Sequence, residues 1–252
     1  MSQGEQVLAL HVDASYGTGW WYEGGGLFRH QYLVRVDPVH FEFDRAWASA
    51  TTTGAVHSAN GVLQASSASM QLRATVQSTA ASPASVHVQA VVLDPTGKTV
   101  ATTTLGPQSV APGAELELSG SVSIASPVLW TLQNPALYTI QLALAGPSCT
   151  DNLTITTGIR SIHFDSSKGL YLNGQNVKMR GFCDHSNFGG VGAAVPDRVN
   201  LFRVQKLRTV GANAWRMVRG GGGGKRKGGG GGGGGGGRER ERRRRRRRRR
   251  GR

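Results

Sequence analysis

The sequence predicts a mainly β chain that consists of an immunoglobulin-like β-sandwich, a βα unit and a disordered tail. Three observations support this prediction. Residues 38–158 hold about seven short apolar or alternating segments separated by turn residues, which is typical of a sandwich. From residue 169 the pattern runs strand, loop, helix, strand, which is the repeating unit of a parallel α/β barrel. From residue 219 onwards only Gly, Arg, Lys and Glu occur.

The N-terminal segment, residues 1–37, contains two predicted strands. Val7–Val12 is rich in apolar residues, and residues 31–36 form a second such run just before the Asp-Pro pair at 37–38. Between them stand Trp20 and Trp21 and a glycine-rich stretch. Two strands alone have unpaired edges, so this segment is expected to need further strands beside it.

The sandwich is predicted from strands and turns that follow each other closely. The clearest strands are residues 72–76, 86–93, 114–118 and 138–144. Turns are expected at Gly54, Asn60-Gly61, Ser82-Pro83, residues 94–97, Pro112-Gly113 and Asn134-Pro135, because these residues favour turn geometry.

The βα unit begins with a hairpin. Asn173-Gly174 suits a two-residue turn and is predicted to join residues 170–172 to a strand at 177–180. Residues 181–192 are then predicted to be a glycine-rich loop that carries Cys183, Asp184, His185 and Asn187.

A helix is predicted from Pro196 to Gly211. Proline suits a first helical turn, and glycine commonly ends a helix. Apolar Val199, Phe202, Leu207 and Val210 fall at helical spacing, with Arg198, Arg203, Lys206 and Arg208 expected outside. Residues 213–217 are predicted to start the next strand.

Two of these segments resemble a known family. Leu172–His185 and Gly211–Arg216 are similar to the entry into the catalytic barrel of glycoside hydrolase family 2, which includes β-galactosidases, β-glucuronidases and β-mannosidases. Trp20-Trp21 with residues 24–29 resembles the end of the family's sugar-binding jelly roll. Residues 127–138, with Trp130, resemble part of its sandwich domain. The resemblance implies a jelly-roll remnant at 1–37, the sandwich at 38–158, the start of a TIM barrel at 159–217 and the tail at 218–252.

The resemblance implies a retaining O-glycosidase of carbohydrate metabolism. We predict no cofactor and no metal. Such enzymes use two carboxyl groups roughly 5 Å apart, and in this family both are glutamates on later barrel strands. No glutamate occurs in residues 159–217, so we expect the chain as given to be inactive. The resemblance assigns His185 to the sugar and Arg216 to a catalytic carboxylate, with Asp184 and Asn187 as further substrate-binding candidates. Cys183 stands where many relatives carry Asn. An alternative is a noncatalytic carbohydrate-binding or scaffold protein.

The positive charge is confined to the tail. The formal charge is +15, but residues 219–252 alone hold 16 Lys or Arg and two Glu. The Arg-rich end, Arg238–Arg252, would bind nucleic acid non-specifically through charge. Gly, Arg, Lys and Glu are also the residues that all-purine codons encode, so a translated purine tract is a second explanation for the composition of the tail.

The chain has only two cysteines, so we predict neither a disulfide framework nor a zinc site. No apolar run is long enough to predict a membrane span.

Overall fold

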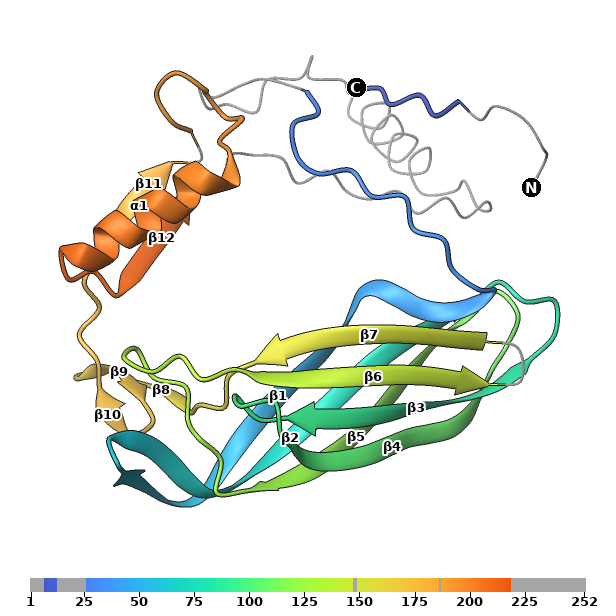
Figure 1. The fold of residues 1–252 in the computed structure, drawn as a ribbon, viewed down its shortest axis with the longest axis horizontal. Helices are drawn as coiled ribbons and strands as arrows, with labels where there is room; N and C mark the ends of the chain where they lie inside the picture. The colour runs from blue at the N-terminus through green and yellow to red at the C-terminus, as the bar shows by residue number, and fades with distance from the viewer. Residues whose placement is uncertain (1–6, 13–25, 147–148, 186, 219–252) are drawn as a thin grey trace, which may run out of the picture.

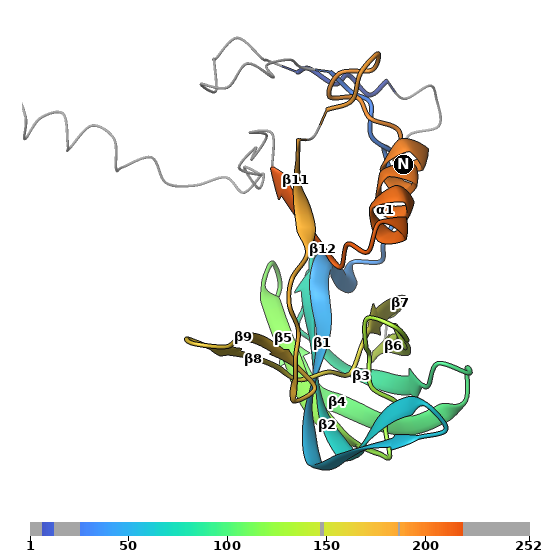
Figure 2. The ribbon, with the colours of Figure 1, turned by 90° about the vertical axis from the view of Figure 1, so that its left-hand side faces the viewer.

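The computed structural model describes residues 7–12, 26–146, 149–185 and 187–218. Figures 1 and 2 show a large β-sandwich, a small hairpin sheet at one end of it, and a βα unit beyond the hairpin. The predicted tail and the Trp20-Trp21 pair lie outside the described residues. Val218, which was assigned to the tail, is the last residue of a strand.

The sandwich has seven strands in two antiparallel sheets. One sheet has the order β1-β2-β5 and the other has the order β4-β3-β6-β7. The predicted mainly β fold is therefore confirmed. The strand bounds are β1 (Val39–Ala59), β2 (Val62–Ser78), β3 (Ala84–Leu93), β4 (Thr99–Val110), β5 (Glu115–Ala125), β6 (Tyr138–Gly146) and β7 (Cys149–Thr157).

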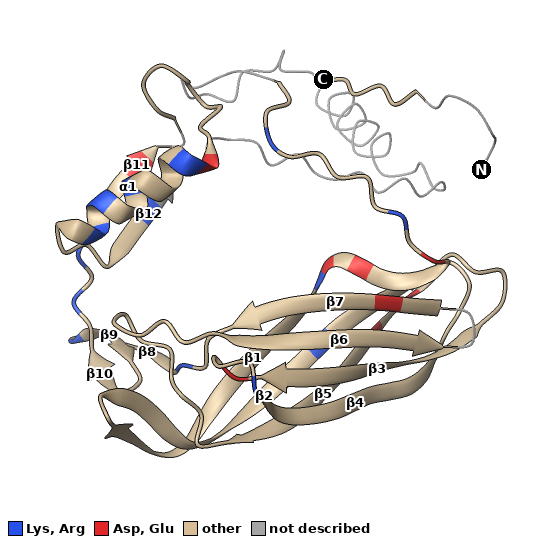
Figure 3. Ribbon diagram, viewed as in Figure 1, with Lys and Arg blue, Asp and Glu red and all other residues tan. Residues whose placement is uncertain are grey.

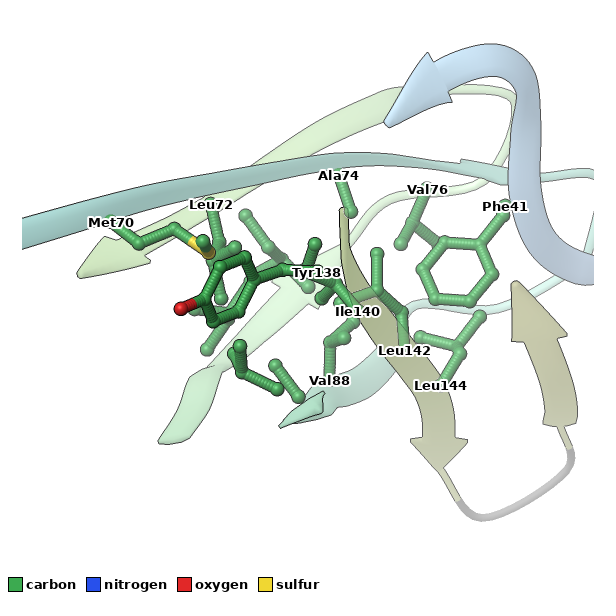
Figure 4. Close-up of a cluster of buried hydrophobic side chains, with 14 of the residues drawn as sticks. Phe41, Met70, Leu72, Ala74, Val76, Val88, Tyr138, Ile140, Leu142 and Leu144 are labelled. Atoms are coloured by element: carbon green, nitrogen blue, oxygen red, sulfur yellow. The ribbon is translucent and has the colours of Figure 1, made fainter. Parts of the chain in front are cut away.

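Alternation along the strands builds the core between the two sheets. In β3 the side chains of Val86, Val88, Ala90 and Val92 are all fully buried, with partly or fully exposed residues between them. This is the two-residue period of a strand with one face inward. Figure 4 shows the two sheets meeting through side chains such as Leu72, Val76, Tyr138 and Ile140. The Tyr138 hydroxyl accepts a hydrogen bond from the Val128 backbone at 2.9 Å, which satisfies its polar end.

Most of the predicted turns are present, with one exception. Asn60 and Gly61 both have positive φ and join β1 to β2, as a two-residue hairpin requires. The turn predicted at Gly54 is wrong, because Gly54 lies inside β1. There the pairing register with β2 shifts between Thr53 and Val56, so the positive φ of Gly54 accommodates a bulge rather than a turn.

The two predicted N-terminal strands are also wrong. Residues 7–12 and 26–36 pair with no strand among the described residues, and their apolar side chains are exposed. Leu33, for example, is 96% exposed. Apolar composition favours a strand, but a strand exists only when a neighbour accepts its backbone hydrogen bonds.

The hairpin at the end of the sandwich is shorter than predicted. It is formed by β9 (Gly169–Leu172) and β10 (Gln175–Asn176). Together with β8 (Ile162–Asp165) these strands make a small sheet in the order β10-β9-β8. The turn at Asn173-Gly174 is confirmed, and both residues have positive φ. The strand predicted at 177–180 is wrong, because these residues are the connection to the βα unit.

The βα unit contains β11 (Gly181–His185), α1 (Asp197–Thr209) and β12 (Ala214–Val218). The two strands are parallel, with the helix between them in the chain, as predicted. The first strand, however, falls on residues that were predicted to be a loop. Glycine at 181 suggested a loop, but it permits close approach, since a Cβ there would collide with the Ala214 carbonyl of the neighbouring strand.

Candidate functional site

The candidate site lies where β11 and β12 end. Their register pairs Cys183 with Arg216 and His185 with Val218, so the two strands finish at the same edge. The start of the pair is fixed by Asn213. Its side chain accepts a hydrogen bond from the Arg180 backbone at 2.8 Å and donates one to the Lys178 carbonyl at 3.1 Å. These contacts give Asn213 a structural role.

His185 is the last residue of β11 and is half-buried. It was expected in a loop after a strand, and the structure places it at the end of the strand itself. Residues at the carboxyl ends of parallel strands converge on one edge of a sheet. His185 is thus positioned by the backbone pairing of β11 with β12.

Asp184 is engaged by the helix. Its Oδ1 accepts a charge-assisted hydrogen bond from Nη2 of Arg203, and both side chains are largely enclosed, at 21% and 13% exposed. Its Oδ2 is buried and has no hydrogen-bond partner among the described residues. The carboxylate therefore holds α1 against β11.

Arg216 faces the thiol of its strand neighbour. Its Nη1 lies 3.5 Å from Sγ of Cys183, and both residues are exposed. A guanidinium has five N–H donors in a rigid fork, so one weak contact to sulfur leaves most of its donor capacity available to a carboxylate. Asn187 is half-buried, and its backbone carbonyl accepts a hydrogen bond from Arg203.

The structure thus brings Asp184, His185 and Asn187 together around Arg203 and puts Arg216 on the adjacent strand. Sequence reasoning placed Arg203 on the outside of the helix, which is wrong. Val199, Arg203 and Leu207 follow each other at four-residue intervals and are all partly buried. That spacing puts Arg203 on the same face of the helix as the two apolar residues, and it was the available signal that Arg203 is enclosed. The prediction relied on the charge of Arg203 instead.

A cavity lies elsewhere in the structure. It has a volume of about 530 Å³ and lies between the β1–β2 turn, the loop at 131–134 and the β9–β10 hairpin. None of the four predicted site residues lines it. Among the described residues there is no cluster of His, Cys, Asp and Glu that could hold a metal ion. No helix in the described ranges is long and apolar enough to span a membrane.

Comparison with known proteins connects this architecture to one family. Residues 57–160 match the family model described as glycosyl hydrolases family 2. The chain is 31% identical over 212 residues to the β-galactosidase BoGH2A of Bacteroides ovatus, across 83% of this chain and 24% of that protein. It is 23% identical over 197 residues to a β-glucuronidase of Formosa agariphila, across 77% of this chain and 20% of that protein.

Solved structures agree with this comparison. The fold is similar to a glycosyl hydrolase family 2 member from Bacteroides cellulosilyticus, with a TM-score of 0.62 and 26% identity over 73% of this chain and 23% of that one. It is also similar to a β-glycosidase from Bacteroides vulgatus, with a TM-score of 0.60 and 28% identity over 78% of this chain and 23% of that one. The chain spans about a quarter or less of the curated relatives it matches.

Proposed function

We propose that the whole protein is a retaining O-glycosidase that acts on β-linked galactose or glucuronic acid. The chain carries a segment that is typical of glycosyl hydrolases family 2. The relatives that align along most of the chain have names that specify these two activities. Retaining hydrolysis needs one carboxyl group as acid/base and another as nucleophile. The residues described here would supply the sugar-binding surroundings of that pair.

The observation that carries the proposal is the common edge formed by the ends of β11 and β12. Active sites of α/β barrels form at the carboxyl ends of the strands. In this proposal His185 contacts a sugar hydroxyl and Arg216 orients a catalytic carboxylate through its planar fork. Asn187 lines the same subsite, and Asp184 supports it through its contact with Arg203.

We further infer that the 252-residue chain alone does not hydrolyse glycosides. None of its seven glutamates lies in residues 159–217. Glu115 and Glu117, in β5 of the sandwich, lie 3.6 Å and 3.4 Å from the guanidinium groups of Arg45 and Arg73. These exposed pairs stabilise a sheet surface only weakly, and they are not on the strands that form the candidate site.

Two measurements on the purified chain test these statements. Hydrolysis of 4-nitrophenyl β-galactoside and 4-nitrophenyl β-glucuronide should not exceed the buffer rate, and enzyme-dependent release would contradict the inferred inactivity. Titration with methyl β-galactoside and methyl β-glucuronide should shift the imidazole NMR signals of His185 with millimolar affinity. The variant Arg216→Lys should keep this response to methyl β-galactoside if Arg216 acts only on a carboxylate of the enzyme. A spectrum that neither sugar changes would refute the sugar contact.

A second candidate function rests on the charge of the tail. The Arg-rich end, Arg238–Arg252, would bind nucleic acid through phosphate contacts, with an affinity that falls steeply as salt concentration rises. Deletion of residues 219–252 should abolish RNA binding and leave the sugar response unchanged. A noncatalytic carbohydrate-binding role makes a different prediction: the sandwich should still bind sugar after residues 169–252 are removed.

A further inference from the structure

Arg203 is enclosed in a helix that otherwise presents little buried surface. No residue of α1 is fully buried, and the large apolar side chains of Leu201, Phe202 and Val204 are 45–57% exposed. The side chain of Arg203 is only 13% exposed. Burial of a guanidinium has a large desolvation cost unless its donors are satisfied. The contacts that satisfy it therefore indicate what this side chain does.

These contacts converge on one short stretch of the chain. Nη2 donates to the Asp184 carboxylate and, at 3.2 Å, to the carbonyl of His185. Nη1 donates to the carbonyl of Asn187 at 3.4 Å. One rigid fork thus binds three of the four residues at 184–187. Figure 3 shows that α1, which lies beside the β11–β12 pair, carries several Lys and Arg residues.

Two aromatic rings complete the surroundings of the guanidinium. Its Cζ lies 5.6 Å from the ring centroid of Phe188 and 5.6 Å from that of Trp215. Cation–π contacts at this distance are favourable and strengthen when water is excluded. Phe188 follows the clamped backbone and Trp215 belongs to β12. Arg203 therefore links the helix, both strands and the loop that leaves β11.

We propose that Arg203 is the positioning residue of the candidate site: it holds the Asp184 carboxylate and the backbone carbonyls of His185 and Asn187, and so sets the direction of the His185 and Asn187 side chains toward a sugar. The identity of the ligand rests on the proposed function, whereas the clamp itself rests on the contacts above. Loss of the fork leaves the Asp184 carboxylate enclosed without its cation and frees two backbone carbonyls. The loop then samples other conformations while the strand pair remains.

The test compares three variants of the full chain. Arg203→Met removes the charge and the fork, and Arg203→Lys keeps the charge without the fork. Arg198→Met changes an exposed arginine of the same helix and is the matched control. Hydrogen exchange is followed at Asn187, Phe188 and Val191, and at the strand amides of Cys183 and Trp215. The proposal predicts exchange about tenfold faster or more at 187–191 in Arg203→Met, since hydrogen bonds to charged groups are worth about that factor.

Arg203→Lys should give a smaller acceleration, and Arg198→Met should match the unmodified chain. Equal acceleration at 187–191 and at the strand amides, in both Arg203 variants, would show that Arg203 only holds the unit together, and would overturn the positioning role. Unchanged exchange at 187–191 in Arg203→Met would overturn it as well.

The same samples, titrated with methyl β-galactoside, separate this proposal from the proposed function. Faster exchange at 187–191 without a His185 response to sugar in any variant would support the clamp and refute the sugar contact. A sugar response in the unmodified chain that persists unchanged in Arg203→Met would support the sugar contact and refute the clamp. A response that Arg203→Met loses, and that Arg198→Met keeps, supports both.

Discussion

The β-sandwich and the βα unit differ in what encloses their residues. In the sandwich, apolar side chains from all seven strands are buried between two sheets, and most of them are less than 3% exposed. In the βα unit, α1 has no buried residue and the described strand pair carries an exposed Phe182. Its most enclosed contacts include an arginine, a carboxylate and backbone carbonyls.

This difference indicates which part of the chain is stable by itself. Burial of apolar surface is the dominant favourable term in folding, and among the residues that the structure describes only the sandwich has it in quantity. Polar contacts add specificity but small net stability. We therefore expect the sandwich to unfold as a cooperative unit and the βα unit to open locally well before it, as regions with few buried apolar contacts do.

The largest expected effect comes from a matched pair of leucine substitutions. Leu118 in β5 is fully buried, and Leu201 in α1 is 57% exposed. Leu118→Ala should lower the free energy of unfolding of the sandwich by about 3 kcal/mol, because it removes buried methyl groups and leaves a cavity. Leu201→Ala should change it by less than about 0.5 kcal/mol. Urea denaturation followed by far-ultraviolet circular dichroism measures both.

The pair is informative because the chemical change is identical. If Leu201→Ala destabilised the sandwich transition as much as Leu118→Ala, the two regions would share one cooperative unit, and the comparison above would be wrong. Equal and small effects would show instead that the sandwich core tolerates loss of volume.

Sequence patterns predicted the sandwich better than the βα unit, for the same physical reason. Alternating residues such as those of β3 report burial on one face, and the Asn60-Gly61 and Asn173-Gly174 turns depend only on local φ preferences. Both signals are local. The position of α1 was predicted from its Pro196 and Gly211 boundaries, which are local too.

The errors concern features that depend on a distant partner. Residues 31–36 have strand composition but no neighbouring strand among the described residues. Gly181 suggested a loop, yet it lies in β11. Glycine is needed there because the Ala214 carbonyl approaches it closely. Arg203 was expected outside because its aromatic and carboxylate partners lie 12 to 19 residues away in the chain. The candidate site residues Asp184, His185 and Asn187 were predicted by resemblance, whereas the side chain that gathers them was not.

The next expected effect uses the two cysteines, of which one lies in each region. Cys149, in β7, is 4% exposed; desolvation, followed by the charges of Asp37 and Asp151, raises the pKa of its thiol. Cys183, in β11, is exposed and 3.5 Å from the Arg216 guanidinium. Because thiolate is the reactive form, iodoacetamide should modify Cys183 about a hundredfold faster or more.

Mass spectrometry of digested samples gives the two rates separately. The variant Cys183→Ser isolates the slow reaction, and its rate should follow unfolding of the sandwich as urea is added. Rapid modification of Cys149 in native buffer would show that the sandwich opens as easily as the βα unit, which would remove the contrast between them.

The smallest expected effect concerns a polar contact within the sandwich. Asp94, in the turn between β3 and β4, accepts hydrogen bonds from the Thr96 hydroxyl at 2.6 Å and from the backbone N–H groups of Thr96 and Lys98. The hydrogen bond from the Thr96 hydroxyl is the main reason why the pKa of the Asp94 carboxyl group lies below its ordinary value of 3.8. Asp94→Ala should reduce stability by about 1 kcal/mol, because the turn is exposed to solvent.

The pH dependence has a defined sign. A carboxyl group whose pKa is lower in the folded state stabilises that state at pH values above its unfolded pKa of 3.8, and the contribution is lost as the pH falls through the folded pKa. The stability difference between the unmodified chain and Asp94→Ala should therefore be constant near neutral pH and should shrink below about pH 4. Asp94→Asn, which keeps an acceptor oxygen but has no charge, should show a smaller loss and no such pH dependence. If the difference persisted undiminished in acid, the ionised carboxylate would not be the source of the stability, and the sandwich would depend on its apolar core even at its turns.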